Sequence, residues 1–180
     1  MKGYRCLMRN LAAVAAGVLM AAQANAHSAS DAFVTLTVQK SRELDGEKTI
    51  VQGQWDVALR DLDFVLRLDD NGDGDIAWGE LRKHQTTIAQ YTYRSIHFGG
   101  DGSACLVKPT RQLVDYHADG AYAALFFTIV CKGALTHLTL DYGLFFDVDP
   151  SHRGILVMRS GDSVATAVLS PDNSHLQLPL

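Results

Sequence analysis

The sequence predicts a mainly β fold, an antiparallel β-sandwich with a helix–loop–helix insertion between its second and third strands. Three observations lead to this prediction. Short runs of β-branched and aromatic residues recur along the chain and are separated by turn residues. Between residues 56 and 92 the spacing of apolar residues changes from a strand-like to a helical period. A segment rich in aspartate and glycine, residues 69–80, interrupts this helical region.

The strand candidates occur at the regular spacing that is typical of sandwiches and barrels. Residues 33–38 and 49–55 form the first predicted hairpin. The other predicted strands are residues 106–116, 122–131, 135–146, 154–159 and 163–169. Asp119 and Gly120 both tolerate positive φ, so they are the predicted two-residue turn of the second hairpin. Residues 173–180 are expected to form either an edge strand or a frayed tail.

Residues 1–26 resemble an export signal. The segment begins with basic residues, continues with an apolar run over residues 11–22, and ends with the small-x-small sequence Ala24-Asn25-Ala26. The apolar run is shorter than the roughly 20 residues that a spanning helix needs. We therefore expect cleavage before His27, with a retained membrane anchor as the alternative. The mature chain, residues 27–180, is then a single periplasmic or secreted domain without a membrane span.

The composition of the mature chain favours cations as ligands. Removing the signal takes away three of the 16 basic residues and none of the 20 acidic ones, which leaves 13 basic residues and a net charge of −7. A negative charge of this size argues against nucleic acid or an anionic membrane as a partner.

Two cysteines remain after signal cleavage, Cys105 and Cys131. In an oxidising compartment, two cysteines on neighbouring strands are expected to form a disulfide. Such a bridge stabilises the fold by about 3 kcal/mol, because it restricts the unfolded chain. Two buried free thiols are the alternative.

Residues 69–80 match the twelve-residue loop of an EF-hand calcium site. Asp69, Asn71 and Asp73 occupy positions 1, 3 and 5, from which side-chain oxygens converge on the ion. Gly74 occupies position 6, where the backbone turns sharply. Helical patterns flank the loop on both sides, which makes this the most specific motif in the chain.

The second half of the loop completes the predicted coordination of Ca²⁺. Asp75 is expected to contribute its backbone carbonyl, a water to occupy the position of Ala77, and Glu80 to bind through both carboxylate oxygens. Ile76 is expected to pack on the sandwich, on a partner loop or on a second molecule. A lone hand with a water ligand indicates an affinity of the extracellular type, about 10⁻⁴ to 10⁻³ M. A solvated turn that only resembles a site, or a weak and mostly empty site, are the alternatives.

Other metal ligands and acid–base groups are weaker candidates. His27, at the mature N-terminus, could chelate copper or nickel together with a second histidine, although an ordinary residue is the default. Asp115, His117 and Asp119 surround a predicted turn, and alternation could place Asp115 and His117 on one face. A second polar loop contains Asp147, Asp149, His152 and Arg153. Solvated turns and loop anchors are the commoner interpretation of both groups.

No sequence signature of an enzyme is present. The chain lacks a Gly-x-Ser-x-Gly elbow, a lone catalytic cysteine with a partner histidine and a phosphate-binding loop with its lysine. We therefore predict a non-catalytic protein. Trp55 and Trp78, on either side of the insertion, are expected to be core contacts that fix it to the sheet.

Several segments resemble the N-terminal extracytoplasmic region of the HupE/UreJ family of hydrogenase and urease accessory proteins. They are residues 27–38, 53–63, 69–81, 113–122 and 142–154. Members of that family continue into a membrane domain associated with nickel or cobalt uptake, and this sequence has no such helices. The resemblance therefore implies the extracytoplasmic domain and the calcium loop, and a membrane permease or another envelope protein as partner.

These observations support two main hypotheses. The first is an exported calcium-binding protein with one EF-hand site that is structural or presents a surface to a partner. The alternative is an accessory module that handles nickel or copper together with a membrane permease. A hydrolase is the third hypothesis.

Overall fold

The computed structural model describes residues 30–43 and 46–180. The predicted export signal, residues 1–26, and the candidate ligand His27 lie outside the described residues. Within the described part, neither helix is long and apolar enough to cross a membrane.

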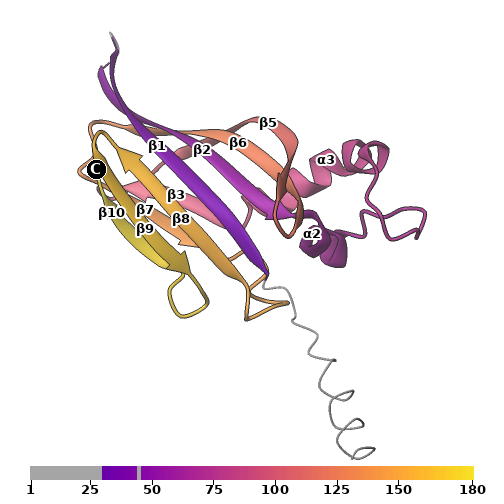
Figure 1. Cartoon of the computed structure of the whole chain (residues 1–180). Helices are drawn as coiled ribbons and strands as arrows, with labels where there is room; N and C mark the ends of the chain where they lie inside the picture. The colour runs from indigo at the N-terminus through magenta and orange to yellow at the C-terminus, as the bar shows by residue number, and fades with distance from the viewer. Residues whose placement is uncertain (1–29, 44–45) are drawn as a thin grey trace, which may run out of the picture.

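The described strands form two sheets, which Figure 1 shows as two layers. The larger sheet has the order β5-β6-β2-β1-β8-β9, and the smaller has the order β10-β7-β3-β4. The strands of the larger sheet are β1 (Asp31–Glu43), β2 (Gly46–Ala58), β5 (Leu106–His117), β6 (Gly120–Lys132), β8 (Arg153–Ser160) and β9 (Ser163–Leu169). Those of the smaller sheet are β3 (Ile96–Gly100), β4 (Ser103–Ala104), β7 (His137–Tyr142) and β10 (His175–Pro179).

The larger sheet is mixed, so the prediction of a purely antiparallel fold is wrong in one respect. β1 pairs with β2 in the predicted antiparallel hairpin, but its other neighbour, β8, runs parallel to it. The smaller sheet is antiparallel throughout. A parallel pair requires a long connection between its strands, and here most of the chain lies between β1 and β8.

The hairpins follow the predicted order with local shifts. The β5–β6 turn consists of Ala118 and Asp119, one residue earlier than predicted, because His117 already pairs with Gly120. The predicted strand 135–146 is shortened to β7, and the C-terminal segment forms β10, an edge strand of the smaller sheet. Turn chemistry therefore located these hairpins to within a few residues.

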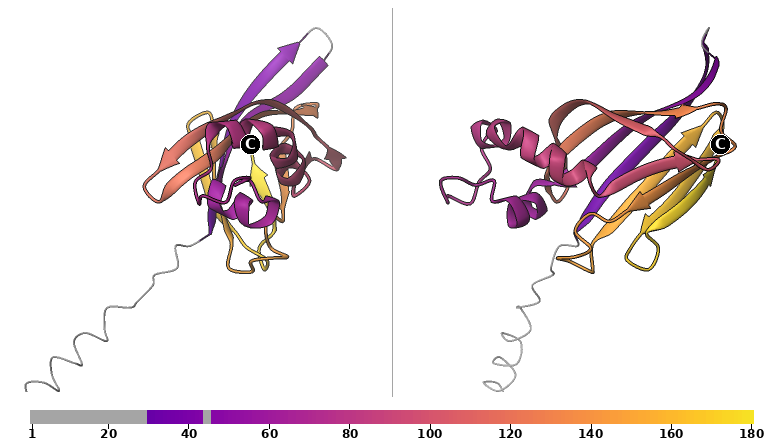
Figure 2. Two further views of the ribbon diagram at one scale, coloured as in Figure 1. Left: turned by 90° about the vertical axis from the view of Figure 1, so that its right-hand side faces the viewer. Right: turned by 180° about the vertical axis from the view of Figure 1, so that it is seen from behind.

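The helical insertion lies between β2 and β3, as predicted, and consists of α2 (Leu59–Leu66) and α3 (Trp78–Tyr93). Figure 2 shows the two helices together at one end of the molecule. The first helix begins later than predicted, because β2 continues to Ala58 and pairs with β6 over its whole final stretch. Asp56 is therefore a strand residue, and this changes which side chains it can meet.

Side chains from both sheets meet in one hydrophobic core, as the predicted sandwich requires. Trp55 of β2 is fully buried, and its ring contacts Tyr142 of the smaller sheet at 5.7 Å between centroids. Phe127 and Phe98 make a similar contact between the sheets at 5.9 Å. The prediction for Trp55 is confirmed.

Trp78 does not belong to this core, so that prediction is wrong. Its side chain is 55% exposed at the first residue of α3. The helix instead buries Leu81 and Ile88, which lie seven residues apart on the face that meets the sheets. Arg82, one turn after Trp78, lies over the indole ring at 6.0 Å.

Cys105 and Cys131 form the predicted disulfide. It joins the residue just before β5 to the penultimate residue of β6, at the end of this strand pair that is farthest from the β5–β6 turn. Disulfides persist in oxidising, extracytoplasmic compartments, so the bridge agrees with the predicted export.

Candidate functional site

The loop of residues 69–80 is held at its start by Asp63 of α2. One carboxylate oxygen of Asp63 accepts hydrogen bonds from the backbone N–H groups of Leu68 and Asp69, at 2.6 and 3.0 Å. Arg67 ends the helix in a left-handed conformation with φ 53°, and Leu68 is fully buried. The first loop residue is thus fixed relative to both the helix and the core.

Asp69 organises the first half of the loop. Its two carboxylate oxygens accept the backbone N–H groups of Gly72 and Gly74, at 2.7 and 2.8 Å. Both glycines have positive φ, 74° and 90°, which residues with a Cβ rarely adopt. The hydrogen bond from Gly74, followed by that from Gly72, lowers the pKa of the Asp69 carboxyl, so this group is ionised at neutral pH.

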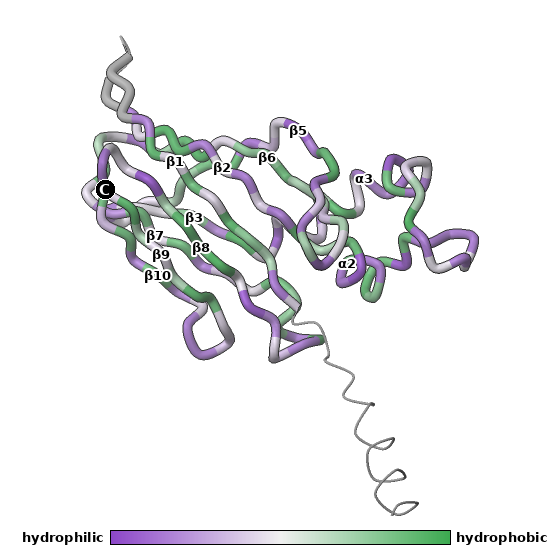
Figure 3. The backbone as a smooth tube through the Cα atoms, viewed as in Figure 1, coloured by the Kyte–Doolittle hydropathy of each residue, from purple (hydrophilic) through white to green (hydrophobic). Residues whose placement is uncertain are grey.

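Asn71 and Asp73 continue the same pattern at alternate positions. The side-chain oxygen of Asn71 accepts the Asp73 N–H, and a carboxylate oxygen of Asp73 accepts the Asp75 N–H. The Asn71 amide also donates to Asp73 at 2.8 Å. Residues 71–75 are all solvent-exposed. Figure 3 shows this loop as a hydrophilic segment between the two helices.

Glu80 connects the two ends of the loop from the first turn of α3. One of its carboxylate oxygens accepts the N–H of Asp70, and the other accepts the N–H of Ala77, both at 2.9 Å. The second of these bonds also caps α3. Ile76 is half-buried and packs against the core, which selects one of the three predicted alternatives for this residue.

Asp70 contacts α3 instead of the loop interior. Its carboxylate pairs with Lys83 at 2.8 Å and with His84 at 3.0 Å. The hydrogen bond from Lys83, followed by that from His84, lowers the pKa of the Asp70 carboxyl. Within the loop, the side-chain oxygens of Asp69, Asn71, Asp73 and Glu80 each accept a backbone N–H group.

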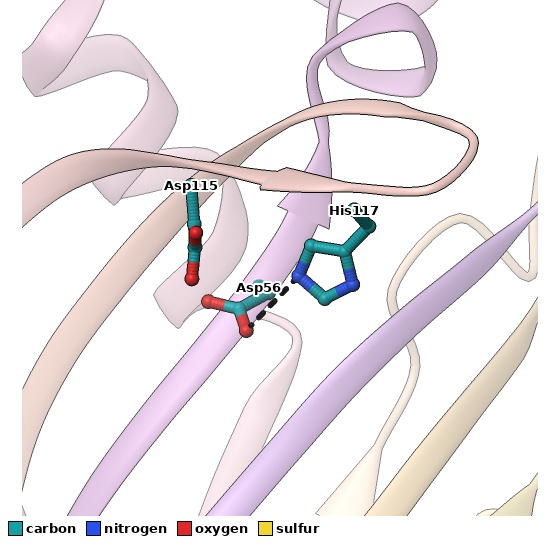
Figure 4. Close-up of side chains that lie close together, drawn as sticks. All are labelled: Asp56, Asp115 and His117. Atoms are coloured by element: carbon teal, nitrogen blue, oxygen red, sulfur yellow. Dashed lines mark ion pairs between the residues drawn. The ribbon is translucent and has the colours of Figure 1, made fainter.

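A group of side chains that could hold a metal ion lies on the outer face of the larger sheet. Asp56 of β2 and Asp115 and His117 of β5 point toward one another (Figure 4), and each offers a donor atom within 4.8 Å of the other two. His117 Nε2 lies 3.5 Å from a carboxylate oxygen of Asp56. We call these three residues the outer-face cluster. Within the described residues, it is a group of His, Cys, Asp or Glu side chains that could hold a metal ion.

Neighbouring side chains hold the outer-face cluster in place. The Gln54 amide donates to both carboxylate oxygens of Asp56, at 2.9 and 3.0 Å. The His117 ring contacts Phe33 at 5.0 Å and Tyr122 at 4.2 Å between ring centroids. Asp56 is only 7% exposed. Burial, opposed by the Gln54 hydrogen bond, raises the pKa of the Asp56 carboxyl, and the nearby Asp115 charge acts in the same direction as burial.

The sequence indicated only part of this cluster. It placed Asp115 and His117 on one face, which the closeness of their donor atoms confirms, but grouped them with Asp119. Asp119 instead accepts a hydrogen bond from the Tyr122 hydroxyl at 2.9 Å. Asp56 was missed because it was assigned to a helix. Trp55 and Val57, on either side of Asp56, are both apolar and face the core, and this alternation was the signal for a strand.

The second polar loop is not an exposed acid–base group. His152 is fully buried, with Nδ1 at 2.7 Å from the Ser30 hydroxyl and Nε2 at 2.9 Å from the Tyr142 hydroxyl. The Asp149 carboxylate accepts hydrogen bonds from the backbone and side chain of Ser151. His152 thus serves as a core contact between segments that are distant in the sequence.

Comparison with known proteins does not narrow the function. No protein-family model matches the sequence, and no curated protein matches it significantly. The molecule is defined by its own features: a mainly β protein of two sheets and two helices, with a disulfide and a group of side chains that could hold a metal ion.

Proposed function

We propose that this is an exported calcium-binding β-sandwich protein, in which the loop of residues 69–80 binds one Ca²⁺ and thereby rigidifies the helical insertion. One observation supports the proposal most. The side-chain oxygens of Asp69, Asn71 and Asp73 recur at alternate positions around a turn that Gly72 and Gly74 permit. Glu80 then closes the loop from the following helix.

The donor set fits calcium better than other common ions. Oxygen ligands suit hard cations, and a loop of this kind offers side-chain oxygens, one backbone carbonyl, one water and a bidentate glutamate, about seven ligands in all. Magnesium requires six ligands at shorter distances. The loop contains no imidazole or thiolate that would favour a softer metal.

Calcium binding would stabilise the insertion because it neutralises carboxylates that the chain gathers in one exposed loop. Lys83 and His84 contact Asp70, which is not one of the proposed side-chain ligands. The ordered insertion exposes two large aromatic side chains, Phe64 on α2 and Trp78 on α3. We propose that this end of the molecule contacts an envelope partner, and the resemblance to HupE/UreJ makes a membrane permease a candidate.

Calcium titration of the mature protein, monitored by thermal unfolding, tests the proposal. With a dissociation constant of about 10⁻⁴ M, about 10 mM Ca²⁺ should stabilise the folded state by about 2.7 kcal/mol. For a chain of this size that corresponds to a rise in Tm of roughly 5–10 °C. Glu80→Gln should remove most of the rise while keeping an oxygen acceptor for the backbone of Ala77.

Asp75→Asn provides the matched control. It changes the charge of the same loop by the same amount, but Asp75 is expected to bind through its backbone carbonyl, so most of the Ca²⁺-dependent rise should remain. Mg²⁺ at the same concentration should give a much smaller rise. Equal losses in Glu80→Gln and Asp75→Asn, or a wild-type protein that does not respond to Ca²⁺, would contradict the proposal.

A further inference from the structure

The outer-face cluster exists because the strand order brings together residues from two strands that do not pair with each other. β6 lies between β2 and β5. Opposite Asp56, β6 contributes Ala124, and opposite His117 it contributes Gly120. Opposite Asp115, β6 contributes Tyr122, whose ring lies against His117. Side chains from both flanking strands meet over β6, as Figure 4 shows.

Two side chains of the outer-face cluster, Asp56 and His117, are held in position by neighbouring residues without a ligand. Gln54 fixes both oxygens of Asp56, and the rings of Phe33 and Tyr122 fix the plane of His117. Asp115 is exposed, so the cluster opens to solvent on the β5 side. Two carboxylates share this space with one partly exposed imidazole, and one of the carboxylates is almost fully buried. Such an arrangement favours a cation.

We propose that Asp56, Asp115 and His117 bind a divalent transition metal ion of borderline softness, with Zn²⁺ as the representative, at a site separate from the calcium loop. Two carboxylates neutralise the two charges of the ion. The imidazole nitrogen is a ligand that zinc and similar ions accept readily, whereas calcium prefers oxygen. The inference goes beyond the proposed function, because it concerns other residues, other elements and another class of metal.

The geometry requires only a small adjustment. Zinc binds nitrogen and carboxylate oxygen at about 2.0–2.2 Å, so ligand atoms in a tetrahedral site lie about 3.4 Å apart. The donor atoms of the cluster lie within 4.8 Å of one another, and a shift of about 1 Å in the side chains would bring them to that spacing. Three protein ligands leave the fourth position to water, on the solvent side next to Asp115.

Zinc titration in the presence of about 10 mM Ca²⁺, which keeps the calcium loop occupied, tests the proposal by calorimetry. The protein is the untagged mature chain with His27→Ala, so that the predicted N-terminal chelate cannot contribute. We expect one Zn²⁺ per molecule. His117→Gln and Asp56→Asn should each weaken binding by about 100-fold or more, since even loss of a residue behind a ligand commonly costs 10–100-fold.

His175→Gln is the matched control, because His175 forms another histidine–aspartate pair, with Asp141 at 2.6 Å, but is not part of the cluster. The His175→Gln variant should bind Zn²⁺ with the same affinity as the protein that carries only His27→Ala. Side-chain nitrogen NMR gives a second readout that does not depend on mutation: Zn²⁺ should shift the ring nitrogens of His117 and leave those of the other histidines unchanged.

The proposal is overturned if Zn²⁺ does not bind, if binding survives His117→Gln, or if the shifted ring nitrogens belong to another histidine. Circular dichroism of each variant without metal shows whether it folds. Where a variant does not fold, the NMR readout decides, because it does not depend on mutation of the cluster. Glu80→Gln should leave Zn²⁺ affinity unchanged while it removes the response to Ca²⁺, so the failure of either site is recognised independently of the other.

Discussion

His152 illustrates how a single buried side chain can make stability depend on pH. Ser30 donates its hydroxyl proton to Asp61 at 2.9 Å, so the Ser30 oxygen must accept a proton from His152 Nδ1. His152 Nε2 is then free to accept the Tyr142 hydroxyl. The ring is neutral in this network, and burial is the main cause that lowers its pKa to about 4.

The sign of the pH effect follows from that lowered pKa. The unfolded chain takes up a proton at His152 near its usual pKa of 6.5, whereas the folded chain does so only near pH 4. The stabilisation by neutral His152 is therefore fully present above pH 6.5 and is lost as the pH falls toward 4, by about 3 kcal/mol. Urea unfolding at several pH values between 4 and 7 should show this loss.

His152→Gln should flatten the pH dependence between pH 4.5 and 6.5 by about one proton per molecule. His175→Gln is the control variant, because it makes the same substitution at a histidine whose side chain is 62% exposed. If wild type and His152→Gln show the same slope, another group is responsible for the pH dependence.

At the scale of the element, the loop of residues 69–80, the proposed calcium site, depends on how α2 ends. α2 has eight residues, which is too short for a helix to be stable by itself. Its buried residues Leu59 and Leu62, together with Leu68 just beyond it, attach it to the core. The carboxylate of Asp63 holds the start of the loop against this fixed helix, because it accepts hydrogen bonds from the N–H groups of Leu68 and Asp69.

Asp63→Ala should loosen the loop more than the sheets. Two backbone N–H groups lose their acceptor, which should cost about 1–2 kcal/mol and weaken Ca²⁺ binding, because Asp69 is no longer held in position. Hydrogen exchange should show faster exchange at the amides of Leu68 and Asp69, with the strands unchanged. Asp63→Asn keeps an oxygen acceptor and should retain most of the protection. Equal exchange in Asp63→Ala and wild type would contradict this role.

At the scale of the whole molecule, contacts between distant segments close the structure. β1, near the start of the described chain, pairs with β8, and His152 links the same region to Tyr142. The disulfide adds a covalent link between residues that are 26 positions apart. Both sheets contribute to a single core, so we expect them to unfold together.

Removing the disulfide by Cys105→Ala and Cys131→Ala should lower the free energy of unfolding by about 3 kcal/mol. Alanine is chosen because Cys131 is only 2% exposed, so that serine at this position would place a hydroxyl in the core. Urea unfolding of the oxidised wild type, the reduced wild type and the double variant measures the effect. The two proteins without the bridge should agree with each other, and unchanged stability in both would contradict the prediction.

The sequence by itself determined those features that depend on neighbours along the chain. Alternation and turn residues located the first hairpin and the β5–β6 hairpin, and the change of period located the insertion. The loop of residues 69–80 follows directly from its spacing of Asp, Asn, Gly and Glu. Only two cysteines follow the predicted signal, so one pairing was expected, and the structure confirms it.

Only the tertiary structure decided which distant residues meet. The parallel pairing of β1 with β8, the burial of His152 and the exposure of Trp78 depend on the order of strands and the packing of layers. The outer-face cluster depends on β6 lying between β2 and β5, so that side chains from the two flanking strands meet over it. Local periodicity indicates which face of an element is apolar, but it does not indicate which other element covers that face, because that choice depends on the packing of the whole chain.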